Sequence, residues 1–191
     1  MSHWDTLWMI NQRDQITHVN EGYKQFARDN GAEHLAEGSC GRSLWDFVTG
    51  PDLTQIYVSL IRRLRGGLGP FEMSFRCDSP DCRRKLRMRV EGVGLSRGIM
   101  FRSRLIEAQP REPIALLDPS ANRAANAKPI PFCSWTNRLW TPRGWLEVEE
   151  AVEELQLFQR DTQPPLAYTI SDEALGQLMR QIETLGSAGA E

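Results

Sequence analysis

FEMSFRCDSPDCRRKLRMRVEGVGLSRGIMFRSRLI, residues 71–106, is the stretch that decides the fold. Apolar and polar residues alternate over 71–75 and again over 86–90, and a third apolar-rich run follows over 98–106. A period of two indicates strands that bury one face. The residues Asp-Ser-Pro at 78–80 are typical of a turn. The stretch therefore predicts three consecutive antiparallel strands joined by hairpins.

The residues before this stretch predict two more strands and three helical segments. Runs 7–11 and 16–19 form a hairpin pattern, and Asn20 is placed to cap a helix after it. A short apolar turn over 41–48 precedes a long amphipathic helix over 51–67. The prediction is an α+β fold, a five-stranded antiparallel sheet with helices on one face.

The residues after this stretch change in composition. Segment 109–130 is rich in Pro and Ala and predicts a linker. Segment 131–191 predicts a small helical tail, with one helix running from Trp145 to Phe158 and a last helix capped by Ser171. The expected organisation is thus a domain over 1–108, the linker, and the tail.

The charges are unevenly spread along the 191 residues, although the net charge is only −2. Residues 60–104 hold 12 Arg and Lys against 4 Asp and Glu, whereas residues 145–191 hold 10 acidic residues against 2 basic ones. Blocks of opposite sign more often dock on each other or face solvent than recruit nucleic acid. We expect the Arg-rich strand to be solvated or to dock the acidic helix over 147–154, and we do not expect nucleic-acid binding.

The chain shows no basic and apolar leader at its start and no apolar run of the ~18 residues that span a bilayer. The expectation is a cytoplasmic protein without membrane association. The four cysteines are then expected to be reduced thiols or ligands rather than disulfides.

Known catalytic motifs are missing from the sequence. It holds no G-x-S-x-G, no Walker-type GK[ST] and no H-E-x-x-H, and its three His residues all lie within the first 34 positions. We therefore expect that the chain is not an enzyme.

Several segments resemble the PAS domains of bacterial signalling proteins over about residues 4–108. The resemblance is carried by WMINQRDQITHVN (8–20), YKQFARDNG (23–31), GRSLWDFV (41–48), the long helix and the three closing strands. It implies a sensory or protein-interaction module that holds a small ligand, where it holds one, between the sheet and the long helix. The alternative is that the same residues are simply the hydrophobic core.

The matching pocket positions are Met9, Tyr23, Phe26, Trp45, Tyr57, Ile61, Phe71, Met73, Met88 and Phe101. No cofactor is predicted, because the long helix lacks a His for haem and lacks a reactive Cys for flavin at its start. An unidentified small molecule is compatible with these positions.

A narrower resemblance rests on FRCDSPDCRRKLRMRV, PREPIALLD and CSW. These segments resemble a group of PAS-like bacterial proteins whose carboxy-terminal segment carries CSWC and, further on, a second C-x-x-C. Here Thr136 replaces the second Cys of CSWC, and Ser171 and Ala174 stand where the second pair would fall. One thiolate cannot form a closed tetrahedral zinc site. Cys133 is therefore predicted to be a buried or half-buried thiol without metal.

Packing of Trp135, Trp140 and Trp145, which recur at a spacing of five, is expected to replace metal in holding the tail together. Cys77 and Cys82 flank the Asp-Ser-Pro turn and are the candidates for a redox pair or for ligands, with two ordinary thiols as the alternative. The basic residues over 83–85 would lower the pKa of these thiols.

The sequence thus predicts a signalling module that binds a small ligand or a protein partner and relays the change to another protein. The expected partner is another protein or a second copy of the chain in a homodimer. One alternative is a dimerisation or adaptor protein without ligand. A second is a nucleic-acid-associated regulator that uses the basic hairpin.

Overall fold

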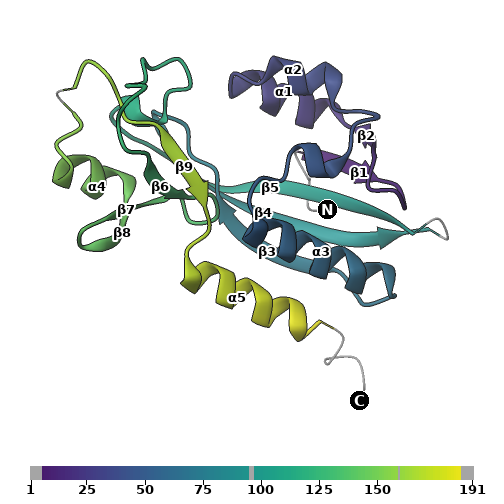
Figure 1. Cartoon of the computed structure of the whole chain (residues 1–191). Helices are drawn as coiled ribbons and strands as arrows, with labels where there is room; N and C mark the ends of the chain where they lie inside the picture. The colour runs from purple at the N-terminus through teal and green to yellow at the C-terminus, as the bar shows by residue number, and fades with distance from the viewer. Residues whose placement is uncertain (1–5, 95–96, 159, 186–191) are drawn as a thin grey trace. The chain divides into compact units, whose positions relative to one another are not determined.

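The computed structural model describes residues 6–94, 97–158 and 160–185 (Figure 1). The elements in chain order are β1 (Thr6–Ile10), β2 (Ile16–Val19), α1 (Glu21–Asp29), α2 (Glu33–Gly38), η1 (Leu44–Asp46), α3 (Pro51–Arg65), β3 (Phe71–Arg76), β4 (Cys82–Val93), β5 (Gly98–Pro110), η2 (Ala115–Leu117), β6 (Ile130–Cys133), β7 (Arg138–Thr141), β8 (Gly144–Glu147), α4 (Val148–Glu154), β9 (Leu166–Thr169) and α5 (Asp172–Glu183). Among the described helices, none combines the length and the apolar character that crossing a bilayer requires.

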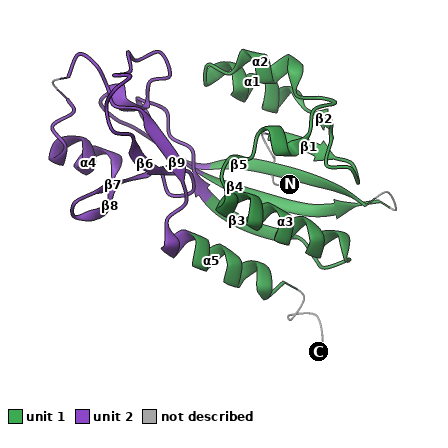
Figure 2. Cartoon of the chain, in the orientation of Figure 1, with its two compact units in different colours: residues 1–74, 86–105, 175–191 green, residues 75–85, 106–174 purple. Residues whose placement is uncertain are grey.

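The chain divides into two compact units, each made of separated segments (Figure 2). Unit 1 comprises residues 1–74, 86–105 and 175–191, and unit 2 comprises residues 75–85 and 106–174. This division differs from the expected sequential parts, because strands β4 and β5 contribute residues to both units.

Unit 1 is built on a five-stranded antiparallel sheet with the order β2-β1-β5-β4-β3. Strand β1 pairs with both β2 and β5, and Trp8 lies opposite Phe101. The α+β class and the five-stranded antiparallel sheet predicted from the sequence are confirmed.

The helices of unit 1 begin where the sequence signals place them. Asn20 caps α1 by accepting a hydrogen bond from the Tyr23 backbone N–H at 2.8 Å, and Pro51 opens α3. A Cβ atom at Gly92 of β4 would lie 3.2 Å from the Leu64 carbonyl oxygen of α3. Glycine therefore permits the close approach of α3 to one face of the sheet.

Unit 2 contains a second sheet, which corrects the expected helical tail. Four short strands form a mixed sheet with the order β8-β7-β6-β9, in which β6 and β9 are parallel. Each strand has only four residues, too few for a period of two to stand out from the sequence. The sheet packs on a buried core made of Ile114, Leu116, Phe132, Leu139, Val148, Ala151, Val152 and Leu157.

The two helices predicted in the tail have different outcomes. Trp145 lies in β8 rather than in a helix, and α4 ends at Glu154, shortly before Gln156, which has a φ of 53°. Phe158 is 61% exposed and not part of a buried helical face. The cap of the last helix is confirmed, because the Ala174 backbone N–H donates to Ser171 Oγ at 3.4 Å.

The segment expected to be a linker packs into unit 2. Ile114 and Leu116 are buried in its core, and Arg123 Nη2 donates to the Leu116 and Asp118 carbonyls at 2.9 Å. Prolines end regular structure here, but the aliphatic residues between them supply core side chains. Composition alone did not separate a linker from an irregular packed segment.

Candidate functional site

The helix-covered face of the unit 1 sheet carries a group of three aromatic rings. Trp8 and Phe101 stack with ring centroids 3.8 Å apart and an interplanar angle of 1°. Tyr57 of α3 tilts against Phe101 at 6.2 Å, and Phe101 is fully buried. Burial raises the pKa of the Tyr57 hydroxyl. This aromatic trio occupies the place where the sequence predicts a ligand pocket.

The predicted pocket residues are only partly brought together. Four of them are buried, namely Ile61, Phe71, Met73 and Phe101. The other six are partly exposed, namely Met9, Tyr23, Phe26, Trp45, Tyr57 and Met88. Met88 shares the α3-facing side of β4 with Gly92, because the two residues are four apart on one strand.

Met9 lies on the opposite face of the sheet. It pairs with Met100, whereas its neighbour Trp8 pairs with Phe101, and successive side chains of a strand point to opposite faces. Met9 and Phe101 therefore cannot line one pocket. Trp8 is the aromatic residue of β1 that faces Phe101, and the unbroken apolar run in TLWMI gave no alternation that could have identified it.

Two other predicted residues make hydrogen bonds outside the aromatic trio. The Tyr23 hydroxyl lies 3.1 Å from Ser39 Oγ, and the Trp45 indole N–H donates to Asp14 at 2.9 Å. Asp14 also accepts a hydrogen bond from Arg65 of α3 at 2.7 Å. The two bonds to Asp14 fix η1 and the β1–β2 turn, and this favours a structural role for Trp45.

Unit 1 has a hollow of about 340 Å³ near the carboxyl end of α3. Its walls include Leu64, Gly67 and Pro70 together with Glu91 and Gly92. None of the ten predicted pocket residues lines this hollow.

The outer face of the unit 1 sheet combines apolar side chains with ion pairs. Leu7, Met9 and Met100 are half-buried there on the central strands β1 and β5. Leu7 pairs with Arg102, so this arginine belongs to the same face.

An ion-pair network borders these apolar residues. Glu91 accepts hydrogen bonds from Arg102 and, at 3.1 Å, from Arg89, which also bonds Glu72 at 2.9 Å. Burial alone would raise the pKa of Glu91, but the hydrogen bonds from the two arginines lower it overall. The face thus presents both charge signs beside an apolar centre.

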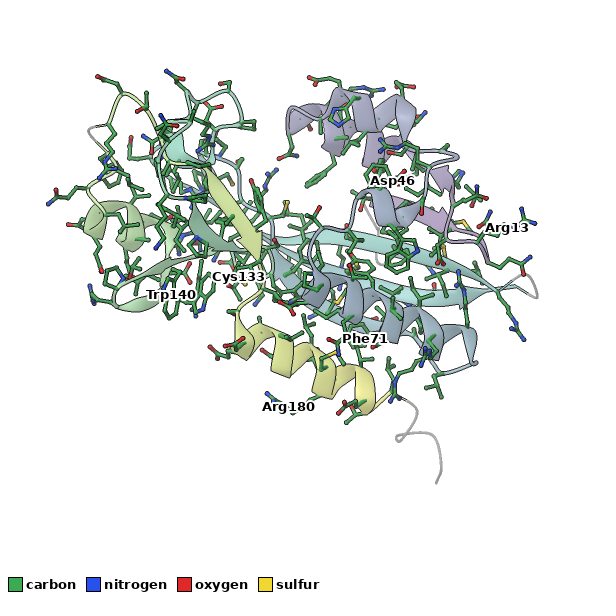
Figure 3. All side chains as sticks on the ribbon, in the orientation of Figure 1. Arg13, Asp46, Phe71, Cys133, Trp140 and Arg180 are labelled. Atoms are coloured by element: carbon green, nitrogen blue, oxygen red, sulfur yellow. The ribbon has the colours of Figure 1, made fainter. Side chains whose placement is uncertain are left out.

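Cys133 of unit 2, labelled in Figure 3, lies at the end of β6 and is hydrogen-bonded to Ser171. Its Sγ atom accepts from the Ser171 backbone N–H at 3.3 Å and lies 3.7 Å from Ser171 Oγ. Ala174 contacts the same hydroxyl through its backbone N–H. The structure therefore brings Cys133 close to Thr136 and to Ser171, whose hydroxyl Ala174 also contacts.

The surroundings of Cys133 favour its thiolate form. Burial raises the pKa of the thiol, but the nearby Thr136 hydroxyl and the backbone N–H groups of Ser171, Thr136 and Trp135 lower it overall. Cys133 has no exposed surface, so the predicted burial is confirmed. Among the residues that the structure describes, no group of three or more His, Cys, Asp or Glu is placed to hold a metal ion.

Cys77 and Cys82 do not face each other directly across the hairpin. The Cys77 backbone N–H donates to Arg84, whereas Cys82 forms a bridge with Ser79. Burial raises the pKa of Cys77 more than the charge of Arg84 lowers it, contrary to the expected lowering. Redox activity of the pair stays a prediction.

Alkylation of the folded protein with iodoacetamide is expected to modify Cys40 first. Cys40 is exposed, whereas Cys133 is fully buried and Cys77 has a raised pKa that reduces its thiolate fraction. Peptide mass spectrometry with and without denaturant measures the three rates. Labelling of Cys133 as fast as that of Cys40 in the folded chain would contradict the packing described for β6.

Asp78 is the centre of a buried charge cluster in unit 2. Its carboxylate has no exposed surface and accepts from Arg76 Nε at 2.9 Å, from the Arg84 backbone N–H at 3.0 Å and from Arg111 Nη1 at 3.3 Å. The Arg111 side chain is only 8% exposed and also bonds Glu149 at 2.8 Å. This cluster ties the 75–85 hairpin to the rest of unit 2.

Docking of acidic residues on the Arg-rich strand, one of the two expected outcomes, is confirmed for Arg83, and Arg76 of β3 makes a further contact of this kind. Arg83 forms a bidentate ion pair with Glu149, with distances of 2.7 and 2.8 Å, and Arg76 donates a hydrogen bond to Glu147 at 3.2 Å. Hydrogen bonds from Arg83 and Arg111 lower the pKa of Glu149 to about 2, against the opposing effect of burial. Opposite charge blocks in the sequence were the signal that identified this contact.

Stability below pH 4.5 is expected to fall less steeply in Glu149→Gln than in the wild type. The pKa of Glu149 is about 2 in the folded chain against an ordinary value of 4.5. Its stabilising effect is therefore full above that ordinary value and is lost as pH falls toward 2. Urea midpoints across this pH range measure the slope, with Glu150→Gln, an exposed neighbour on α4, as the control. Equal slopes in wild type and Glu149→Gln would refute the assignment.

No known protein-family model matches the sequence, and a search of curated proteins returns no match.

Proposed function

We propose that the chain is a non-enzymatic signalling module of the PAS-like kind that acts by protein association, pairing with a second copy through the outer face of the unit 1 sheet. In this role it relays a change to a partner protein. The observation that carries the proposal is the outer face itself, where Leu7, Met9 and Met100 form an apolar centre beside Glu91 and its arginines.

The order of elements in unit 1 supports the PAS-like part of this proposal. Two strands, α1, a short 3₁₀ turn, the long α3 and three strands follow one another in the order that carries the sequence resemblance, and α2 is an additional element between α1 and the turn. The aromatic trio supports association over ligand sensing, because Trp8, Tyr57 and Phe101 occupy the side where a ligand would sit.

The charge pattern of the outer face supports a second copy as the partner. A two-fold interface brings the same patch of both subunits together, so the patch must be complementary to itself. The face carries carboxylates at Glu72 and Glu91 and guanidinium groups at Arg89 and Arg102. Such a mixture can pair with its own copy, whereas a patch of one sign would repel it.

Sedimentation velocity on the full chain tests the proposal. The wild type is expected to form a dimer in a concentration-dependent manner. Met9→Glu and Met100→Glu each place a charge in the apolar centre and are expected to weaken the dimer by about tenfold or more, since an unpaired charge is costly to bury.

Val58→Glu is the matched control, because Val58 is an exposed apolar residue of α3 and not of the outer face. It is expected to leave the dimer unchanged. A wild type that stays monomeric at every concentration would overturn the proposal, and so would equal weakening by Val58→Glu and Met9→Glu.

A further inference from the structure

A hollow of about 220 Å³ lies in unit 2 at the start of β4. Its walls are Arg76, Arg83, Arg84, Lys85, Glu107 and Gln109. Four of these six side chains are cations and one is an anion. The anion is Glu107, and its carboxylate already accepts a hydrogen bond from Gln109 at 2.5 Å.

The carboxylates that pair with the arginines are not part of these walls. Arg76 bonds Asp78 and Glu147, and Arg83 bonds Glu149, but none of these three acids lines the hollow. The ion pairs therefore hold the guanidinium groups in place from outside the hollow. A ligand that binds there meets donors that are already oriented, which lowers the entropic cost of binding.

Arg83 and Lys85 keep hydrogen-bond donors that such a ligand can use. The bonds from Arg83 to Glu149 use Nε and Nη2, and Nη1 makes no hydrogen bond to any residue that the structure describes. Lys85 is exposed and forms no ion pair within the described ranges 6–94, 97–158 and 160–185. An arginine with a free Nη1 beside a free ammonium group is an arrangement suited to phosphate oxygens.

Size and overall charge narrow the class of ligand. Pockets that enclose a drug-sized molecule start at about 300 Å³, so this hollow fits a single small group whose remaining atoms stay in solvent. Unit 2 as a whole holds 13 acidic against 10 basic residues, which disfavours an extended polyanion such as RNA. We infer that the hollow binds one phosphate group, either as the free ion or as part of a small phosphate ester.

This inference is independent of the dimer proposed above, because the hollow and the outer face belong to different units. Isothermal titration calorimetry of the full chain with inorganic phosphate and with glycerol 3-phosphate tests it at low ionic strength. Saturable one-site binding is expected, with a dissociation constant on the order of 1 mM, and none is expected with glycerol. Tighter binding of glycerol 3-phosphate would assign the site to a phosphate ester, and tighter binding of inorganic phosphate would assign it to the free ion.

The chain supplies a matched pair of variants. Lys85→Glu is expected to weaken phosphate binding by about tenfold or more, whereas Lys128→Glu, at another exposed lysine of unit 2, is expected to change it less than about twofold. Both positions are exposed, so both variants are expected to fold. Absence of saturable binding to the wild type, or equal losses in the two variants, would overturn the inference. If single-stranded RNA bound more tightly than the ester, the hollow would be assigned to a nucleic-acid site instead of a phosphate site.

Discussion

Asp78→Ala is expected to lower the free energy of unfolding of unit 2 by about 3–5 kcal/mol, the typical cost of removing one partner from a buried ion pair. The carboxylate is fully buried and neutralises Arg76 and Arg111, the second of which is itself almost buried. Without Asp78, Arg76 loses its closest counter-charge and Arg111 keeps only Glu149, in a place that water reaches poorly. The Arg84 backbone N–H also loses its acceptor.

Urea unfolding followed by tryptophan fluorescence measures this loss, and amide hydrogen exchange locates it in unit 2. Asp81→Ala is the control, since Asp81 is exposed on the same turn and bonds Ser79. Its midpoint is expected to stay near that of the wild type. Equal shifts in the two variants would mean that Asp78 does not hold the hairpin in place.

Thr136→Cys, Ser171→Cys and Ala174→Cys combined in one chain are expected to create a zinc site. Tetrahedral zinc with thiolate bonds of about 2.3 Å places neighbouring sulfurs about 3.8 Å apart. Cys133 Sγ and Ser171 Oγ are already 3.7 Å apart. Backbone N–H groups that lower the pKa of Cys133 would also stabilise a metal-bound thiolate.

Metal analysis and the absorption spectrum of the cobalt-substituted triple variant test this prediction. One equivalent of metal with a tetrahedral thiolate spectrum is expected, together with a rise in thermal stability on adding zinc. A fourth substitution, Cys133→Ser, removes one ligand and is expected to abolish tight binding. A triple variant that binds no more zinc than the wild type would show that the four positions do not converge as described.

Much of unit 1 could be predicted because its signals are long and local. The alternation at Phe71, Met73 and Met88 extends over whole strands, and Asn20 and Pro51 mark helix starts. The set of pocket residues was harder to predict, since it depends on register between strands far apart in the chain. Only the pairing of Trp8 with Phe101 reveals that Met9 belongs to the other face.

Unit 2 shows why the rest could not be predicted from the sequence. Its four-residue strands gain their stability from pairing and from a shared core rather than from a local pattern. Leu139 is fully buried in a core that it shares with Ile114, which belongs to a segment whose prolines suggested a linker. The Arg83–Glu149 ion pair was easier to foresee, because each residue belongs to a long block of one charge.

Native mass spectrometry of the full chain tests the central claim most directly, since it reports subunits, metal and bound small molecules in one spectrum. The proposal of a metal-free association module predicts a dimer with the mass of two unmodified chains. Met9→Glu is predicted to shift the spectrum to monomer. A wild-type monomer that carries the extra mass of a tightly bound organic molecule would contradict the claim and favour a ligand sensor.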